Sequence, residues 1–249
     1  MTNRPLAGAA DLWRFEPSRA NLCTSHLCGE VTLSNPSAGI GGLVWNDVPL
    51  DGYVLGVSAG EPGSASETGS PQDAFARGTD LVAVYAATGP QSFNWQVYWR
   101  VSAREEDVVL LDAILSFQTA LLESFPRVST QSQLPADEVW LVRADGESKR
   151  TQQFGEEPTE DRDCVVLRSS TGNWSYAEMT HPLDQGTWQL AQSEDGKILM
   201  RRNLGGSFLE KGVIRRLRFR GAFLPRENDL QRAAQLFTEL AAETPPLTA

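Results

Sequence analysis

The alternation of apolar and polar side chains in residues 94–103 restricts the fold more than any other feature of the sequence. A period of two places successive side chains on opposite faces of a strand, whereas a helix needs a period near 3.6. One face of the segment carries Trp95, Val97, Trp99 and Val101, and the other carries Gln96, Tyr98 and Arg100. The pattern therefore predicts a β-strand with one buried face and one amphipathic outer face.

Segments of strand character recur along the chain and predict an all-β protein. Several are separated by tight turn sequences such as Asp145-Gly146 and Asp195-Gly196. We expect strands at residues 30–34, 40–45, 53–57, 79–87, 94–103, 107–119, 138–144, 164–168, 174–180, 187–191, 197–203 and 212–223. Residues 108–117 are apolar on nearly both faces, which predicts a central strand between two layers. About a dozen strands exceed the needs of one small sandwich, so we expect a single large domain over residues 1–249.

Two polar stretches and one helix complete the predicted layout. Residues 58–75 are rich in Gly, Ser, Pro and Glu, and residues 150–163 are acidic, so both stretches are expected to be exposed loops. The apolar side chains of residues 228–242 recur at helical spacing. Asn228 is the expected N-cap, and Pro245-Pro246 should stop the helix. One amphipathic helix after so many strands is expected to cover an open end or an exposed edge of a sheet.

Charge and composition narrow the possible partners. The chain has 32 acidic and 22 basic residues, a formal net charge of −10. This balance disfavours nucleic acid and anionic membrane surfaces, because both recruit positively charged proteins. Residues 1–12 lack the apolar run of a signal peptide, and no later segment approaches the length of a membrane span. We therefore expect a cytoplasmic protein.

The metal-binding residues are too few for a metal centre. The three cysteines are Cys23, Cys28 and Cys164, and only His26 lies close to the first two. A structural zinc site needs about four such ligands, so we interpret the cysteines as reduced thiols. We also find no Gly-rich phosphate loop and no serine nucleophile elbow. The sequence thus predicts neither a metal nor a cofactor.

Three arginines in the last strand segment form a candidate binding stripe. Arg216, Arg218 and Arg220 fall at i, i+2 and i+4, so they share one face of the strand. Carboxylates from neighbouring strands could satisfy them in a surface ladder. Alternatively, they could hold an anionic ligand such as a uronate or a sugar phosphate. The pattern favours the internal pairing, because runs of charge are usually solvated faces.

Glu178 and His181 are the candidate catalytic residues. Both are titratable groups within an otherwise apolar, aromatic stretch, and such a pair can perform acid–base chemistry if both reach one cleft. Along a strand, positions i and i+3 point to opposite faces. The pair converges only if the strand breaks near Thr180, which His181-Pro182 permits. A histidine satisfied by the backbone is the simpler interpretation.

The aromatic side chains supply a candidate sugar platform. A tryptophan face can stack on the C–H face of a pyranose while neighbouring polar groups bind its hydroxyls. Trp99 beside Arg100 is the pair we select, although most tryptophans of an all-β protein fill its core.

The opening passage resembles a known family. Residues 30–47 read Glu-Val-Thr-Leu-Ser-Asn-Pro-Ser-Ala-Gly-Ile-Gly-Gly-Leu-Val-Trp-Asn-Asp, which is similar to the opening of galactose-mutarotase-like (aldose 1-epimerase-like) proteins. The resemblance implies a large antiparallel β-supersandwich and a role with carbohydrates, and the predicted C-terminal amphipathic helix adds to this fold. Active aldose epimerases carry an Asn-His-x-Tyr-type motif, whereas Tyr98-Trp99-Arg100 has no histidine. No catalytic residue of the family is therefore carried over.

The sequence supports two main functional hypotheses. The first is a carbohydrate-binding or carbohydrate-modifying protein whose ligand is a small sugar or an anionic sugar derivative. If it is an enzyme, it would act as an epimerase or isomerase, with Glu178 or His181 as the acid–base group. The second is a non-enzymatic protein-interaction module with the same fold. A glycoside hydrolase or lyase is a third option, but no convincing carboxylate pair is apparent. The oligomeric state is left open.

Overall fold

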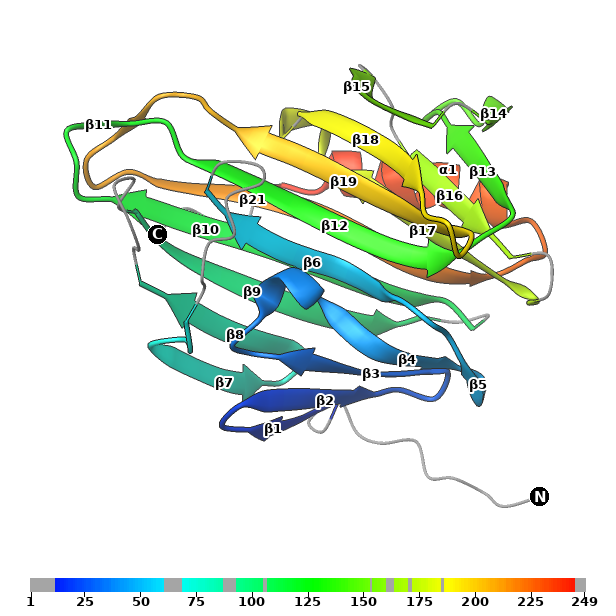
Figure 1. The fold of residues 1–249 in the computed structure, drawn as a ribbon, viewed down its shortest axis with the longest axis horizontal. Coiled ribbons are helices and arrows are strands. Elements are labelled where there is room, and N and C mark those ends of the chain that lie inside the picture. Colours follow the sequence, from blue (N-terminus) through cyan, green and yellow to red (C-terminus); the bar gives the residue numbers. More distant parts are fainter. Residues whose placement is uncertain are drawn as a thin grey trace.

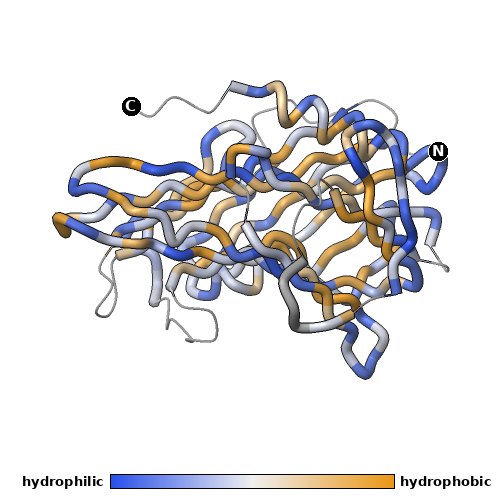
Figure 2. The backbone as a smooth tube through the Cα atoms, turned by 90° about the horizontal axis from the view of Figure 1, so that it is seen from above, coloured by the Kyte–Doolittle hydropathy of each residue, from blue (hydrophilic) through white to orange (hydrophobic). Residues whose placement is uncertain are grey.

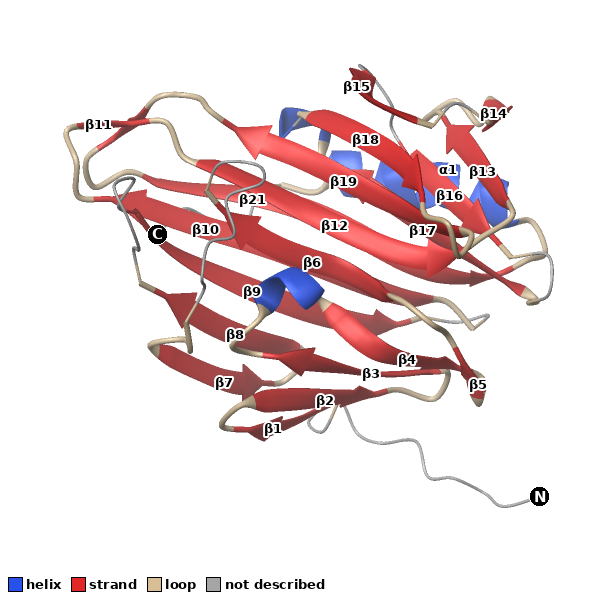
Figure 3. Ribbon diagram, viewed as in Figure 1, coloured by secondary structure: helices blue, strands red, loops and turns tan. Residues whose placement is uncertain are grey.

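Two large antiparallel sheets face each other, and one α-helix lies behind the second sheet (Figures 1 and 3). The structure is a computed structural model that describes residues 12–60, 69–86, 93–104, 107–152, 154–159, 164–169, 172–184 and 186–244. The predicted all-β class is confirmed, as is the sandwich of large antiparallel sheets with a C-terminal helix.

The first sheet has ten strands and lies at the front of Figure 1. Its strands, in spatial order, are β1 (Trp13–Glu16), β2 (Arg19–Cys23), β3 (Leu27–Thr32), β4 (Ile40–Trp45), β6 (Tyr53–Ala59), β12 (Arg127–Pro135), β19 (Lys197–Gly205), β18 (Thr187–Gln192) and β15 (Gly155–Thr159), with β5 (Val48–Pro49) paired to β4.

The second sheet has nine strands and lies behind the first. Its order is β14 (Ser148–Thr151), β13 (Glu138–Val142), β16 (Cys164–Arg168), β17 (Trp174–Thr180), β21 (Ile214–Pro225), β10 (Val109–Thr119), β9 (Phe93–Ala103), β8 (Asp80–Tyr85) and β7 (Asp73–Arg77). The smaller elements are β11 (Glu123–Ser124), which pairs with β20 (Leu209–Glu210), and two 3-10 turns, η1 (Pro36–Ala38) and η2 (Pro182–Asp184).

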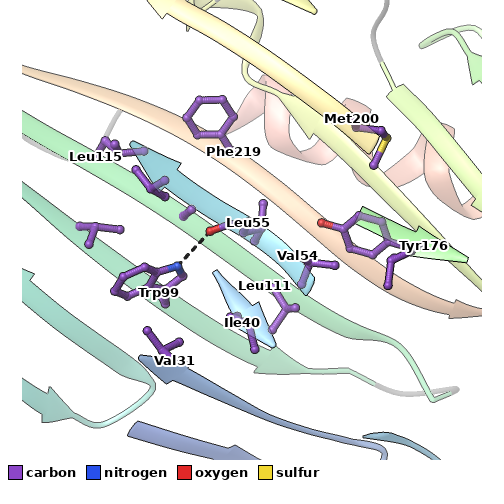
Figure 4. Close-up of a cluster of buried hydrophobic side chains, with 14 of the residues drawn as sticks. Val31, Ile40, Val54, Leu55, Trp99, Leu111, Leu115, Tyr176, Met200 and Phe219 are labelled. Carbon is purple, nitrogen blue, oxygen red and sulfur yellow. Dashed lines mark hydrogen bonds between the residues drawn. The ribbon is translucent and has the colours of Figure 1, made fainter. Parts of the chain in front are cut away.

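The main hydrophobic core lies between the two sheets. The hydropathy of successive residues changes repeatedly between apolar and polar along the strands (Figure 2). Because successive side chains of a strand point to opposite faces, every second residue of a long strand points inward. β9 follows the predicted pattern: Trp95, Val97, Trp99 and Val101 join the core cluster. Trp99 lies among aliphatic side chains of both sheets, and its indole N–H donates to the carbonyl of Leu55 at 3.2 Å (Figure 4). β10 lies near the centre of its sheet, as predicted, and most of its side chains are buried. The C-terminal helix, however, packs mainly on other strands, so it is not the second covering layer expected over β10.

The helix α1 (Asp229–Ala242) covers part of the outer face of the nine-stranded sheet. It packs on β13, β16, β17 and β21, where Phe237 and Leu240 join a second apolar cluster with outward side chains of those strands. The expected helix is thus confirmed, but the expectation that it covers an end or an edge is wrong. The helix lies on the sheet face because outward residues of β16 and β17 such as Val166 and Ala177 are apolar and need a cover.

Ion pairs fix both ends of this helix to the sheet. At its start, the buried carboxylate of Asp229 receives the side chains of Arg168 (2.8 Å) and Ser175. Burial works against this charge, but these hydrogen bonds hold the pKa of Asp229 below its usual value. Asn228 occupies the N-cap position in a left-handed conformation without a side-chain cap bond, which corrects the role expected for it. At the other end, Glu243 bonds to Arg220 at 2.8 Å.

Several strands lie outside the expected segments. β1, β2 and β12 were not predicted. β7 begins inside the first stretch expected to be a loop, and β15 lies within the second. The inward positions of β12 include the polar side chains Thr130 and Ser132. Because inward and outward residues of β12 are both polar, its sequence lacks the apolar–polar alternation that predicts a strand. Residues 61–68 of the first expected loop, residues 160–163 of the second and the prolines at 245–246 lie outside the described residues. In the part of the chain that is described, no helix has the length and apolar character to cross a membrane.

We expect Trp99→Ala and Tyr98→Ala to differ in their cost to stability, because the two side chains lie on opposite faces of β9. Trp99 is 1% exposed, so truncation should lower the free energy of unfolding by about 3–5 kcal/mol. Tyr98 lies on the outer face, and its truncation should cost about 1 kcal/mol. Urea denaturation measures both values. Similar costs for the two variants would contradict the orientation of the strand.

Candidate functional site

Charged side chains align in a row across four strands on the outer face of the nine-stranded sheet. The strand register places Asp80 opposite Arg100, Arg100 opposite Asp112, and Asp112 opposite Arg220. Opposite charges therefore alternate from β8 to β21, the arrangement that stabilises cross-strand pairs. We call these four residues the charged row.

Both arginines of the charged row bind a carboxylate through two nitrogens. Arg100 donates Nε and Nη2 to Asp80 at 2.8 and 2.9 Å, and Arg220 donates the same atoms to Asp112 at 2.7 and 3.1 Å. Two parallel bonds fix the plane of a guanidinium as well as its position. The hydrogen bond from Arg100 to Asp80 raises the pKa of Arg100. Burial disfavours the charge of Arg220, yet its bonds to Asp112 and Glu243 raise its pKa.

Arg218 lies beside the row and binds the end of the helix. Its Nη1 donates to the backbone carbonyl of Glu243 at 3.3 Å, which places a cation at the negative end of the helix dipole. Its Nε lies 3.6 Å from Asp184, and its backbone N–H donates to the same carboxylate at 3.1 Å. Burial raises the pKa of Asp184, although Arg218 opposes that rise.

His181 lies next to Arg218, just beyond the end of β17. Its Nδ1 accepts the backbone N–H of Leu183 at 3.1 Å, and its own backbone N–H donates to the carbonyl of Arg218 at 3.3 Å. Burial, followed by the positive charge of Arg218, lowers the pKa of His181. The ring is therefore neutral near neutral pH. Its Nε2 is buried and has no hydrogen-bond partner among the described residues.

The arginine stripe expected from the sequence is thus on one face, and most of it is paired internally. Arg218 and Arg220 bind carboxylates of Asp184, Asp112 and Glu243. Arg216 is half-buried, and the register places it opposite Ser116 of β10. Of the two alternatives for the stripe, internal pairing holds for Arg218 and Arg220, although both are buried and the partners of Arg218 come from η2 and the helix end.

The outer face of β7, β8, β9 and β10 lies beyond the strands on which α1 packs, and we call it the open part. Here the register aligns Phe75, Val82, Tyr98 and Ile114 in one row next to the charged row. Tyr98 is half-buried, and its hydroxyl donates to the side chain of Gln96 at 2.9 Å. The ring of Tyr98 therefore lies between the apolar side chains of Val82 and Ile114 in its row. The polar side chains of Gln96 and Arg100 flank it along β9.

Arg100 is the arginine of the charged row that reaches solvent. Its side chain is 44% exposed, whereas that of its partner Asp80 is 9% exposed. A guanidinium has five N–H donors, and Asp80 takes two of them. The ion pair therefore orients Arg100 and leaves donors available for a ligand beside Tyr98.

Trp99 does not belong to this face, which corrects its predicted role as the stacking platform. It is 1% exposed and its ring packs between the sheets (Figure 4). Side chains of neighbouring residues point to opposite faces of a strand, so the aromatic group beside Arg100 on the outer face is Tyr98. The alternation of residues 94–103 in the sequence already indicates that Tyr98 shares a face with Arg100 and that Trp99 does not.

Glu178 lies in the interior at 0% exposure. It belongs to β17, yet its carboxylate binds side chains of the facing sheet: Ser132 of β12 at 2.5 Å and Arg202 of β19 at 3.3 Å. Arg202 also donates to the backbone carbonyl of Glu178 at 2.8 Å, and the hydroxyl of Tyr176 donates to the carboxylate at 3.0 Å. Burial, reinforced by the nearby charge of Glu178, raises the pKa of Tyr176 well above its usual value. We call these four residues the buried polar cluster.

Glu178 and His181 therefore do not converge, contrary to the condition on which their catalytic role depends. The carboxylate points between the sheets, and the imidazole lies beside Arg218 and the helix end. The strand does end at Thr180, but the chain after it enters η2 and keeps the two groups apart. Among the described residues, no group of three or more His, Cys, Asp or Glu side chains is arranged to hold a metal ion.

Comparisons with solved structures identify the architecture. A galactose mutarotase-like protein from Lactobacillus casei superposes with a TM-score of 0.50 and 7% identity over 82% of this chain and 99% of its own. A candidate aldose 1-epimerase from Klebsiella pneumoniae gives 0.50 and 8% identity over 91% and 84%. The chain has the galactose mutarotase-like fold. It also superposes on 37% of the length of a 4-alpha-glucanotransferase from Thermococcus litoralis, with a TM-score of 0.47 and 10% identity over 83% of this chain. No protein-family model and no curated protein matches the sequence.

In this galactose mutarotase-like fold, we expect the ion pair of Glu178 and Arg202 to behave as one unit. Glu178→Leu alone leaves a buried guanidinium without its carboxylate, and Arg202→Met alone leaves a buried carboxylate. Either change should lower the free energy of unfolding by about 3–5 kcal/mol. The double variant should cost less than either single one, because it removes both charges. Urea denaturation of all four proteins measures the coupling, and additive costs would contradict it.

Proposed function

We propose that the protein binds a carbohydrate, preferably an anionic one such as a uronate or a sugar phosphate, on the open part of the outer face. The observation that carries the proposal is the position of Tyr98 beside the exposed guanidinium of Arg100. The fold supports it, because the names of the galactose mutarotase-like protein and of the candidate aldose 1-epimerase both refer to sugars.

The two side chains would recognise different parts of one ligand. The ring of Tyr98 offers a face to the C–H groups of a pyranose, and the aligned Val82 and Ile114 form the apolar base below it. The remaining donors of Arg100 would bind a carboxylate or phosphate through charge-assisted hydrogen bonds. Gln96, already bonded to the Tyr98 hydroxyl, would bind ligand hydroxyls. Arg216 lies in the neighbouring row, where it would add positive charge.

On the open part, the protein would bind a sugar without catalysing its conversion. Epimerisation or isomerisation of a sugar needs an acid and a base placed at the same substrate atoms. Glu178 is closed off from solvent, and His181 is 2% exposed. The carboxylates of the charged row, Asp80 and Asp112, are each bound through two bonds to an arginine. Neither of them is therefore available as an acid or a base at this face.

A protein-interaction role is the second candidate, and one observation favours it. Exposed apolar side chains gather where β11 pairs with β20, at one end of the long axis of the molecule (Figure 1). They are Leu121, Leu122, Phe125, Phe208 and Val213, and the two phenylalanine rings lie 5.9 Å apart. Exposed apolar patches often mark interaction sites. Under this hypothesis, sugars would not bind the sheet.

Isothermal titration with galacturonate, glucose 6-phosphate and galactose tests the carbohydrate proposal. The wild-type protein should bind the two anionic sugars more tightly than galactose. Arg100→Gln should weaken binding of the anionic sugars by roughly tenfold, which corresponds to about 1.4 kcal/mol, and should leave galactose unaffected. Tyr98→Ala should weaken binding of all three sugars, because every pyranose has a C–H face.

The matched control is Arg143→Gln, since Arg143 is a highly exposed arginine outside the open part. It should bind all three sugars as the wild type does. A thermal melt of each variant establishes that it is folded, which matters for Arg100→Gln because Asp80 loses its partner. Absence of binding by the wild-type protein to any of the sugars would overturn the proposal and favour the interaction role.

A further inference from the structure

Two cysteines face each other across the hairpin of β2 and β3. Cys23 is the last residue of β2, and the register pairs it directly with Cys28 of β3. The turn between them is closed by a bond from the N–H of Thr24 to the carbonyl of Leu27 at 2.8 Å. Neither cysteine has a role in the site on the nine-stranded sheet.

Facing residues of antiparallel strands form either a hydrogen-bonded or a non-hydrogen-bonded pair, and the hydrogen bonds around the hairpin show which of the two Cys23 and Cys28 form. The N–H of Cys23 points away from β3 and donates to the carbonyl of Leu12 at 3.0 Å. Because Thr24 and Leu27 form the hydrogen-bonded pair next to it, Cys23 and Cys28 form a non-hydrogen-bonded pair. Cα atoms in such pairs are about 4.5 Å apart, and the side chains approach closely. Disulfides span Cα separations of roughly 4.4–6.8 Å, so this pair can be bridged with the strands in place.

The two thiols are accessible, and the third is not. Cys23 is exposed and Cys28 is partly exposed, whereas Cys164 is fully buried in the cluster beneath α1. Directly paired residues lie on the same face of a sheet, and here that face is the outer one, because Leu22 and Leu27 fill the core from the other side. A bond between the two sulfurs would therefore leave the core packing unchanged.

We propose that Cys23 and Cys28 are a redox-responsive site that forms a reversible cross-strand disulfide with low-molecular-weight disulfides such as oxidised glutathione. The thiolate of Cys23 attacks one sulfur of the glutathione disulfide, giving a mixed disulfide and releasing one glutathione thiolate. The thiolate of Cys28 then attacks Sγ of Cys23 and releases the second. The two protein thiols are oxidised, one glutathione disulfide is reduced to two thiols, and the two thiol protons pass to solvent or to the released thiolates.

The bond would fix a turn that connects the two sheets. His26 lies in that turn, with Nδ1 at 2.9 Å from the side-chain oxygen of Asn46 and Nε2 at 3.0 Å from a carboxylate oxygen of Asp107. Asp107 lies just before β10 of the nine-stranded sheet. A disulfide at the base of the turn restricts the hairpin that carries His26. The oxidised protein should therefore hold this corner of the sandwich more firmly.

Incubation of the native full-length protein with oxidised glutathione, followed by intact-mass analysis and peptide mapping, tests the site. The wild type should lose the mass of two hydrogen atoms and yield a peptide with Cys23 linked to Cys28. Its melting temperature should rise by about 5 °C, and dithiothreitol should reverse both changes. A thiol reagent should then find a single reactive group, Cys164, and only after unfolding.

Two variants distinguish the internal bond from ordinary surface oxidation. Cys28→Ser should stop at the mixed disulfide, with one glutathione attached to Cys23 and no rise in melting temperature. Cys164→Ser should behave as the wild type does in the linkage assay. The proposal is overturned if the wild type keeps all three thiols, or if it accumulates the same glutathione adduct as Cys28→Ser. It is equally overturned if the bond forms only in denaturant.

Discussion

The contact between Glu178 and Arg202 joins the two sheets through a part of their interior that is polar. Glu178 comes from the nine-stranded sheet, and its carboxylate is bound by Arg202 and Ser132 from the ten-stranded sheet. A buried charge must be paired and hydrogen-bonded, because desolvation costs several kcal/mol per ion. These bonds link β17 directly to β12 and β19. The cluster therefore adds to the hydrophobic packing around it a directional constraint on how the sheets lie.

The arrangement of charged residues on the outer face of the nine-stranded sheet follows from the same strands that build the interior. β21 pairs with β17, and its side chains alternate, so that Leu217 and Phe219 enter the core while Arg218 and Arg220 point outward. The two arginines bind the C-terminal end of α1 through Glu243. The helix thus covers the strands on one side, and the open part begins where the charged row extends beyond it to Arg100. The same strands that build the core thereby define where a ligand would bind.

Sequence patterns predicted the strands with apolar inward faces but not the polar interior. The predicted and observed boundaries of β4, β16 and β17 agree. The core-facing residues of β4 and β16 are apolar, whereas the inward face of β17 combines Trp174 and Tyr176 with Glu178. β12 was missed because Thr130 and Ser132 are its inward residues, and they are polar where the strand faces Arg202 and Glu178. For the same reason the sequence makes Glu178 a candidate catalytic acid, since it shows a carboxylate in an apolar context without showing what that carboxylate binds. The arginine stripe was placed on the correct face, but its partners come from β10, η2 and the helix end, which no local pattern connects.

Residue-resolved NMR mapping of the bound sugar tests the central claim most directly. Backbone and side-chain shifts of isotope-labelled protein are recorded during a titration with galacturonate. The account predicts that the largest changes fall on Gln96, Tyr98 and Arg100, with smaller ones at Arg216. The outward residues of the ten-stranded sheet, such as Arg201, should remain unchanged. Changes centred on that sheet or on the buried polar cluster, with Tyr98 unaffected, would contradict the assignment of the open part as the ligand-binding face.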